Sequence, residues 1–257
     1  MRRFILALLC CALPASPALA WGQTGHRVTG AIAENYLSGV ARANVRLLLG
    51  PESLAQAASW PDDMRSDPAE FWQKTADPWH YVTVPAGSTH AATGAPPEGD
   101  AVSALARFAA TLRNPAASPA DKRLALRFTI HIIGDLHQPL HAGRPGDRGG
   151  NNVKVSWFGA ETNLHSVWDS KMIDSRQLSH SELAGWLAAS IAPEQVIAWS
   201  NPDPAAWIAE SVELRETVYP TDPKLSYAYS YRYGGAVDAR LSRSGVRIAA
   251  YLNRIFG

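Results

Sequence analysis

The sequence predicts a mostly α-helical single domain over residues 21–257, with one short β-hairpin near residues 153–160. The 257 residues are 46% hydrophobic and 18% charged, which suits one folded domain with a sizeable core. Helical spacing of apolar residues recurs along the chain, whereas the alternation typical of strands is rare. Helices are expected at 101–113, 119–137, 163–176, 180–191, 204–218 and 235–255.

A long first helix is expected soon after residue 21. The stretch GHRVTGAIAENYL places Val28, Ile32 and Tyr36 at helical spacing, and Thr24 is a candidate N-cap. Residues 50–100 are then rich in proline and glycine, which interrupt regular structure. This part of the chain is therefore expected to be mainly loop.

The helix at 119–137 and the hairpin have clear local signals. Ser118 can cap the helix, Pro119 suits its first position, and Asp121 complements the positive end of the helix dipole. Residues 153–157 alternate apolar and polar types, as in a strand with one buried face. A turn near Gly159 would close the hairpin.

Residues 1–20, MRRFILALLCCALPASPALA, have the composition of a secretory signal peptide. Arg2 and Arg3 precede an apolar run, and small residues end the segment. Its two prolines make a buried N-terminal helix a poor alternative. Cleavage after Ala20 would leave Trp21 as the new N-terminus, so a periplasmic or secreted protein is expected.

Both cysteines of the chain, Cys10 and Cys11, lie in that segment. The mature chain would have no disulfide, and its stability would come from packing or from metal. Without Arg2 and Arg3 the count of Lys and Arg falls from 24 to 22 against 23 acidic residues, a formal charge of −1. A broad basic surface for nucleic acid is thereby excluded, so a polyanionic substrate would have to be met by metal ions or single arginines.

The stretch HIIGDLHQPLH, residues 131–141, has the residue types of a metal site. His131 and Asp135 are four residues apart, so on a helix both point to one face. Pro139 turns the chain, which lets His141 approach from another direction. His137 is less well spaced and is interpreted as a residue that lines the site or supports a ligand.

Further candidate ligands lie elsewhere in the chain. HSVWD provides a second pair at helical spacing, His165 and Asp169. The others are Asp62 and Asp63 in SWPDDMR, His80 in WHYV, His26 in WGQTGH, and the α-amine and carbonyl oxygen of a processed Trp21. Zinc usually takes three or four nitrogen and oxygen ligands, so this set fits a cluster of two or three ions bridged by carboxylates.

Each of these residues also has a less specific interpretation. A lone histidine such as His26 or His80 is more often a hydrogen-bonded core residue than a ligand. Two separate His/Asp pairs followed by a third histidine make metal binding the better hypothesis. His90 and His180 stand in polar contexts and are expected to be solvated.

Six motifs in order resemble the secreted type I nucleases of fungi and plants, which have bacterial relatives. They are W-G-x-x-G-H at 21–26, S-W-P-D-x-x-R at 59–65, W-H-Y-V at 79–82, H-x3-D-x-x-Q-P-L-H at 131–141, G-D-x-G-G-N at 146–151 and N-L-H-S-V-W-D at 163–169. The resemblance implies an all-α fold shared with zinc phospholipase C. It also implies an enzyme with three zinc ions that cleaves single-stranded nucleic acid and also acts as a 3′-nucleotidase.

The resemblance further implies which residues hold each zinc. A first zinc would take Asp62, His80, His131 and Asp135; a second His141, His165 and Asp169; a third the Trp21 amine and carbonyl, His26 and a bridging Asp135. Eukaryotic members carry disulfides, which this mature chain lacks, so its stability should depend more on zinc.

Several residues are expected to act on substrate. Asp62 would orient the attacking water while ligating, and Arg65, one helical turn on, would bind phosphoryl oxygens; its alternative is a solvated arginine. Substrate-binding candidates are Asn151, His137 and Tyr81, while Trp60, Trp79 and Tyr81 are candidates for base stacking or for the core. Some relatives carry a base-contacting carboxylate at the position of Thr83, so base preference stays open.

The expected reaction is hydrolysis of single-stranded DNA and RNA to 5′-phosphate products, and 3′-mononucleotides are expected as further substrates. The protein is expected to be a monomer that needs no membrane and no obligate protein partner. The nearest alternative is a secreted zinc phospholipase C, which typically has Glu where this chain has Asp169. A periplasmic zinc-binding protein without activity is a second alternative, although it would not need Arg65 beside the cluster.

Overall fold

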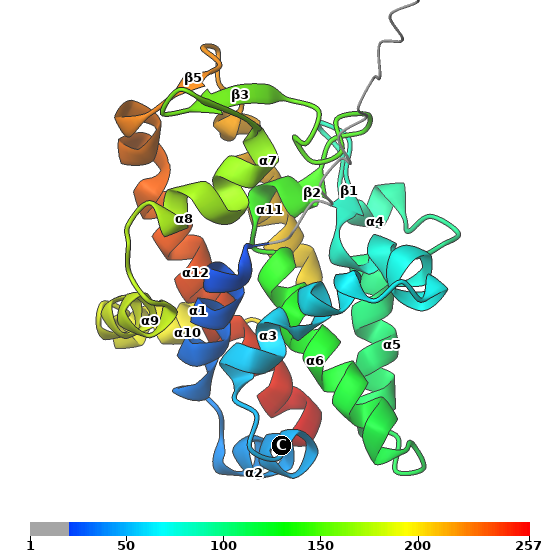
Figure 1. Ribbon diagram of the computed structural model, residues 1–257. Coiled ribbons are helices and arrows are strands. Elements are labelled where there is room, and N and C mark those ends of the chain that lie inside the picture. Colours follow the sequence, from blue (N-terminus) through cyan, green and yellow to red (C-terminus); the bar gives the residue numbers. More distant parts are fainter. Residues whose placement is uncertain (1–20) are drawn as a thin grey trace, which may run out of the picture.

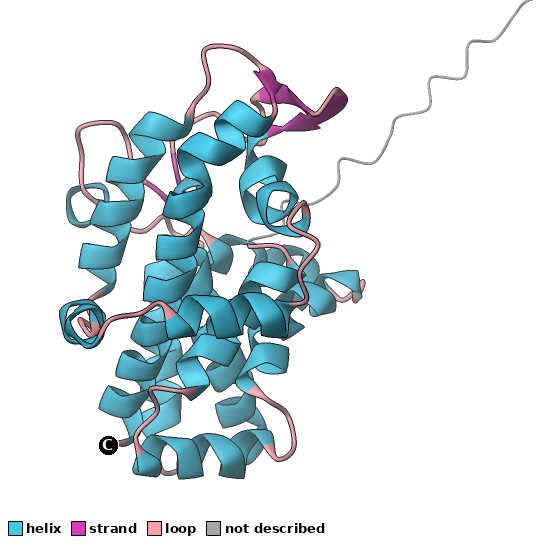
Figure 2. Cartoon of the chain, turned by 90° about the vertical axis from the view of Figure 1, so that its left-hand side faces the viewer, coloured by secondary structure: helices cyan, strands magenta, loops and turns pink. Residues whose placement is uncertain are grey.

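Helices make up most of residues 21–257, the part of the chain that the computed structural model describes (Figures 1 and 2). This confirms the predicted fold class. The α-helices are α1 (Gln23–Glu34), α2 (Gly39–Leu49), α3 (Leu54–Asp63), α4 (His90–Thr93), α5 (Ala101–Arg113), α6 (Pro119–Asp135), α7 (Leu164–Ser166), α8 (Met172–Asp174), α9 (His180–Ala189), α10 (Pro193–Trp199), α11 (Pro204–Val218) and α12 (Tyr227–Phe256). Short 3-10 or π turns lie at Met64–Ser66, Phe71–Thr75, Asp77–His80, Pro139–His141 and Val167–Lys171.

The expected signal peptide lies outside the described residues. Within residues 21–257, each helix is too short or too polar to cross a bilayer.

Four helices, α1, α3, α6 and α12, form the centre of the molecule (Figure 1). Glycines let their backbones approach closely. A Cβ at Gly30 of α1 would lie 2.4 Å from the carbonyl oxygen of Leu54 in α3, and one at Gly245 of α12 would lie 2.4 Å from the side chain of Ile32. Any larger residue at these positions would push the central helices apart.

Apolar side chains form two core clusters. One packs α5 and α6 against α2, α3 and the C-terminal part of α12, with Phe108, Phe128 and Trp79 among its members. The other surrounds the N-terminal part of α12 and includes Trp21 and Trp168. α1 contributes residues to both clusters, so it is held between them.

The predicted hairpin is confirmed. Strand β3 (Lys154–Trp157) pairs antiparallel with β4 (Ala160–Asn163), and β5 (Lys224–Leu225) adds to β3 in parallel. Phe158 and Gly159 connect β3 to β4 with φ of +50° and +86°, the left-handed conformation that tight hairpin turns require.

A second, two-stranded parallel sheet joins distant parts of the chain. In β1 (Val82–Thr83) and β2 (Ala142–Gly143), Val82 pairs with Ala142. Arg215 of α11 is fully buried beside this sheet, and its guanidinium donates to the carbonyl oxygens of Val84, Ala142 and Gly143. Because one strand follows His80 and the other follows His141, the sheet brings these two histidines together.

The expectation of mainly loop at 50–100 is wrong for α3. Ser53 forms a capping box with Gln56, and residues 54, 57, 58 and 61 bury one helical face. Pro61 stands near the end of the helix, where it allows the chain to continue into a 3-10 turn. Helix α4 also lies within this range.

Other boundaries also differ from the prediction. Helix α1 begins at Gln23 after Gly22, so Thr24 lies inside it and is not the N-cap. Helix α12 starts at Tyr227, eight residues before the predicted 235, and runs through Gly234 and Gly235 because its buried face continues there. The sequence interpretation did not include α2 and α10, whereas α5 and α11 have the predicted bounds.

Candidate metal centre

Three groups of buried His and Asp side chains lie at the centre of the described chain. The first group is His80, His131 and Asp135. His131 Nε2 and His80 Nδ1 lie 3.2 and 3.1 Å from Asp135 Oδ2. As predicted, His131 and Asp135 lie on one face of α6; His80 ends the 3-10 turn before β1.

The second group is His141, His165 and Asp169. His165 Nε2 lies 3.0 Å from Asp169 Oδ2, one helical turn on. The ring centres of His141 and His165 are 5.0 Å apart. Gln138 supports this group, since its amide nitrogen donates to Asp169 Oδ1 at 2.6 Å.

The third group is His26, Asp62 and His131. His26 Nε2 lies 3.2 Å from Asp135 Oδ1 and 3.9 Å from Asp62 Oδ2. The two oxygens of Asp135 therefore face different groups, which is the geometry of a bridging carboxylate. Trp21 is fully buried next to this region, and the amide of Gly22 donates to the Asp169 carbonyl oxygen at 2.7 Å.

Backbone carbonyl groups fix the orientation of three histidines. In each case Nδ1 donates to a carbonyl oxygen, so Nε2 is the nitrogen left to face the other members of its group. The pairs are His131 with Ala58 at 2.7 Å, His141 with His80 at 2.6 Å and His165 with Gly149 at 2.7 Å.

Several buried polar atoms in these groups have no hydrogen-bond partner within residues 21–257. They are both ring nitrogens of His26, both oxygens of Asp62, Oδ1 of Asp135 and Nε2 of His141. A folded protein rarely leaves so many buried acceptors in one place unsatisfied. Imidazole nitrogens and carboxylate oxygens are the donor set that zinc takes, so these residues fit zinc ions.

Burial controls the protonation of these groups when metal is absent. It raises the pKa of Asp62 to about 7 and that of Asp169 to about 6, and it raises the pKa of Asp135 well above its usual range. Burial likewise lowers the pKa of His26, His80, His131 and His141. A bound cation would stabilise the ionised form of these carboxylates and so lower their pKa values.

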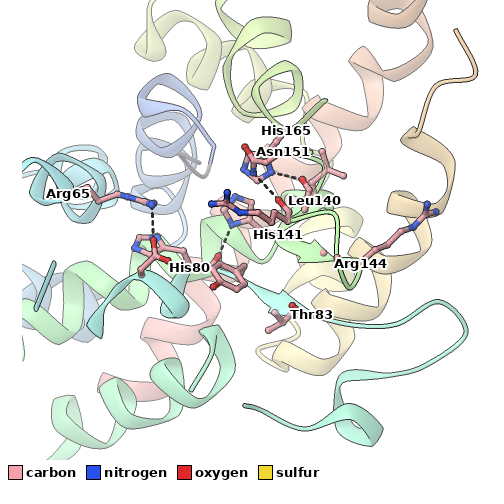
Figure 3. A pocket seen from close by; sticks show the side chains of 15 residues that line it. Arg65, His80, Thr83, Leu140, His141, Arg144, Asn151 and His165 are labelled. Atoms are coloured by element: carbon pink, nitrogen blue, oxygen red, sulfur yellow. Dashed lines mark hydrogen bonds and ion pairs between the residues drawn. The ribbon is translucent and has the colours of Figure 1, made fainter. Parts of the chain in front are cut away.

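A pocket of about 340 Å³ opens onto this centre (Figure 3). His80, His141 and His165 line it, so the first and second groups reach its wall. Arg65 lines the opposite side from Arg144 (Figure 3). The pocket thus combines metal-type ligands with positive charge, which suits an anionic substrate.

The structure places most of the predicted substrate residues at this pocket. Arg65 lies 3.8 Å from Asp62 and 2.9 Å from Asp77, so it is held beside the centre and is not a freely solvated arginine. Tyr81, Thr83 and Asn151 also line the pocket.

The structure corrects the prediction that His137 binds substrate. Its ring is fully buried, Nδ1 donates to the Ile133 carbonyl oxygen, and Nε2 lies 3.0 Å from Arg247. It does not line the pocket, so it is not placed to bind substrate. The guanidinium groups of Arg240 and Arg247, far along the chain, determine this position.

For two of the three aromatic candidates the structure favours packing within the protein, the alternative to base stacking. Trp79 is buried between Phe108 and Phe128, and Trp60 packs edge-on against Trp72. Tyr81 alone of the three lines the pocket, with 42% of its surface exposed.

His90 was expected to be solvated, but its ring is only partly exposed. Its Nε2 lies 2.6 Å from a carboxylate oxygen of Asp100, at hydrogen-bond distance. His180 is partly exposed at the first residue of α9.

Sequence reasoning missed four residues at the site: Asp77, Arg144, Arg148 and Gln138. Gln138 and Arg148 lie inside motifs that point to the site, and their proximity to ligands in the sequence was the available signal. Asp77 contacts Arg65 across a proline-rich stretch, which no sequence pattern indicates.

Comparison with known proteins identifies the family. The model of the S1/P1 nuclease family matches residues 21–257. The chain belongs to the S1/P1 nuclease family. Endonuclease 4 of Arabidopsis thaliana is 31% identical, with 100% of this chain and 96% of that protein covered. Nuclease P1 of Penicillium citrinum is 28% identical over 92% of this chain and 98% of its own length, and nuclease S1 of Aspergillus oryzae is 27% identical over 91% of each.

The family confirms the resemblance drawn from the six motifs. The chain is therefore a hydrolase, a nuclease that depends on zinc and acts on single strands. The described residues contain three His/Asp groups that could hold metal ions.

Proposed function

We propose that this S1/P1 nuclease hydrolyses phosphodiester bonds in single-stranded DNA and RNA to 5′-phosphate products and also removes the phosphate of 3′-mononucleotides. The observation that supports this most strongly is the arrangement of three buried His/Asp groups behind a pocket that an arginine lines. Such an arrangement offers cations and a guanidinium to one phosphoryl group.

We propose three zinc ions per chain. His80, His131, Asp135 and Asp62 would hold the first, and His141, His165 and Asp169 the second. His26, Asp135 and the amine and carbonyl oxygen of a processed Trp21 would hold the third. The separate directions of the two Asp135 oxygens and the burial of Trp21 support this division.

Zinc ions at these positions would activate water at neutral pH and neutralise phosphoryl charge. Asp62 would orient the attacking water, since its oxygens are buried and have no hydrogen-bond partner among residues 21–257. Arg65 would bind a phosphoryl oxygen, and Asp77 would hold its guanidinium toward the pocket. Departure of the 3′-oxygen would give 5′-phosphate products.

Tyr81 and Asn151 would bind the nucleotide itself. The half-exposed ring of Tyr81 offers a surface on which an unstacked base can lie. Asn151 donates its amide to the Arg148 carbonyl oxygen at 2.9 Å, which holds it at the pocket wall. A single strand presents such bases, whereas a duplex keeps them paired.

Export and assembly complete the proposal. Residues 1–20 would direct the chain to the periplasm or the medium and be removed after Ala20, which leaves residues 21–257 as one catalytic domain. The enzyme would act as a monomer without a membrane or an obligate protein partner.

The test is to incubate the purified, processed protein with single-stranded DNA, duplex DNA of the same sequence, RNA, 3′-AMP and phosphatidylcholine in parallel. Faster cleavage of single strands, with 5′-phosphate ends by mass spectrometry, is expected. Equal rates on duplex, or 3′-phosphate ends, would contradict the proposal. Hydrolysis of phosphatidylcholine alone would favour a phospholipase C, and zinc-loaded protein that hydrolyses none of the substrates would favour a zinc-binding protein without activity.

A further inference from the structure

Three arginines line the pocket, and two of them have carboxylate partners. Arg65 lies 2.9 Å from Asp77, and Arg144 forms an ion pair with Glu216. The side chain of Arg148 has no ion pair and no hydrogen bond within residues 21–257. The uncompensated positive charge of the pocket is therefore that of Arg148.

The loop that carries Arg148 is held firmly. Asn151 donates its backbone and side-chain N–H groups to the Arg148 carbonyl oxygen at 3.3 and 2.9 Å. The Gly150 amide and the Tyr219 hydroxyl both donate to the carboxylate of Asp147. The backbone under the guanidinium is thus fixed, while its side chain is exposed.

The same loop is joined to a proposed zinc ligand. The Gly149 carbonyl oxygen accepts from His165 Nδ1 at 2.7 Å, and a Cβ at Gly149 would lie 2.4 Å from the Leu140 carbonyl oxygen. Arg148 therefore stands next in sequence to a residue that touches the metal centre.

Arg148 also has an unusual backbone conformation. Its φ is +53°, a region in which residues with a side chain are strained. Glycines with positive φ follow it at 149 and 150, and glycine would avoid the strain at 148 too. A strained, exposed and unpaired arginine at a pocket wall indicates that its charge is used there.

We propose that Arg148 binds the phosphate next to the scissile one and so makes the enzyme favour polynucleotides over substrates with one phosphate. This inference rests on the proposed function, in which the zinc ions and Arg65 bind the scissile phosphate. Arg148 lies close enough to the phenol of Tyr81 to act on it electrostatically, so it stands beside the ring proposed to hold a base. The basic and acidic residues of the chain nearly balance, 24 against 23, so single contacts of this kind would have to meet the charge of the substrate.

The experiment compares the substrates TpT and TpTpT with the zinc-loaded enzyme. The single phosphate of TpT must be the one that reacts, whereas TpTpT always keeps a neighbouring phosphate. Arg148→Gln removes the charge, and Arg148→Asn removes it with a residue that tolerates positive φ. In both variants the ratio of kcat/KM for TpTpT to that for TpT should fall about fivefold, the scale of one exposed ion pair. Arg148→Lys should restore much of it.

Arg46→Gln is the matched control, because it removes the same charge from an exposed residue in the last turn of α2. This helix lies at the other end of the molecule from β1 and β2, whose residues help to line the pocket (Figure 1). Its ratio should equal that of the unchanged enzyme. An Arg148→Asn variant with an unchanged ratio would overturn the inference.

A binding measurement separates this inference from the proposed function. Anisotropy of a labelled phosphorothioate oligothymidylate, measured over a range of salt concentrations, does not require turnover. The slope of log K against log salt should be smaller by about 0.7 in Arg148→Asn, as for one lost phosphate contact to a single strand. If the enzyme hydrolyses neither substrate, the proposed function fails while this slope still decides the role of Arg148. An unchanged slope would overturn the inference on its own.

Discussion

His131 Nε2 and His80 Nδ1 lie 2.8 Å apart, with Asp135 Oδ2 within 3.2 Å of both. The Nδ1 proton of His131 is already donated to the Ala58 carbonyl oxygen. Its Nε2 lone pair therefore points at a second nitrogen and a carboxylate, and the side chains of His131 and Asp135 are fully buried. A cation bound between these three atoms would satisfy all of them at once, so we expect the site to be more stable with metal.

Chelation should therefore lower thermal stability. Residues 21–257 contain no cysteine, so no disulfide between them can replace the cross-links that metal would provide. Zinc present at a thousandfold excess over its dissociation constant contributes about 4 kcal/mol, which corresponds to roughly 10 °C in Tm for a domain of this size. Calorimetry with and without EDTA measures the difference, and added zinc should restore the original Tm. An unchanged Tm in EDTA would argue against metal as a structural element.

Zinc binding should depend on pH through the carboxyl groups. In the metal-free protein, burial raises the pKa of Asp62 to about 7 and that of Asp169 to about 6. Zinc binds the ionised form, so below these values it must displace protons, and its affinity should rise with pH between about 5.5 and 7.5. The histidines add little to this slope, because burial lowers the pKa of His26 and His80 and keeps both neutral.

Calorimetric titration of metal-free protein with zinc, in two buffers of different ionisation enthalpy, gives the number of protons released at each pH. Release should be larger at pH 6 than at pH 8. Equal affinity at both pH values would show that these carboxylates are already ionised before zinc binds.

Replacing Arg65 should affect turnover and leave metal binding largely intact. Its guanidinium lines the pocket 3.8 Å from Asp62, and its closest carboxylate partner is Asp77, which is not a proposed zinc ligand. Arg65→Ala should lower kcat by about 10²- to 10³-fold, the scale of a lost electrostatic contact to the reacting group. Zinc content should stay unchanged, and Arg46→Gln is the control. A change of less than threefold in kcat would remove Arg65 from the catalytic residues.

Gln138 should tune the second metal group through Asp169. Its amide nitrogen donates to Asp169 Oδ1, and its amide oxygen accepts from the Leu140 backbone. Gln138→Met keeps the size but removes both hydrogen bonds, so zinc affinity at this group should fall about 10- to 100-fold. Competition with a chelator measures this loss. Retention of zinc equal to that of the unchanged protein would show that Gln138 only packs.

The sequence contained enough to predict most helices. Helix α11 has the predicted bounds because Asp203 and Pro204 mark its start clearly. Helix α3 was missed because prolines were given more weight than its apolar spacing at 54, 57, 58 and 61. Pro61 occupies a position near the helix end at which it does little harm.

The candidate site was predicted better than the surfaces around it. The nine proposed ligands carry chemistry that shows in the sequence, and the fold brings the side-chain ligands into three groups. Whether a residue faces the pocket depends on partners far along the chain. Arg247, 110 residues after His137, helps to hold that histidine in the core, and no local pattern indicates this contact.

The number of zinc ions is the measurement that tests the account most directly. Crystals of processed protein, never exposed to chelator, would give anomalous difference peaks at the zinc edge. Three peaks are expected, at the groups around His80, His141 and His26. A form with Met retained before Trp21 should show only the first two, because a peptide amide is a poor zinc ligand whereas a free amine with a pKa of about 8 is a good one. One peak or none in the processed protein, or three in the Met-extended form, would contradict the account.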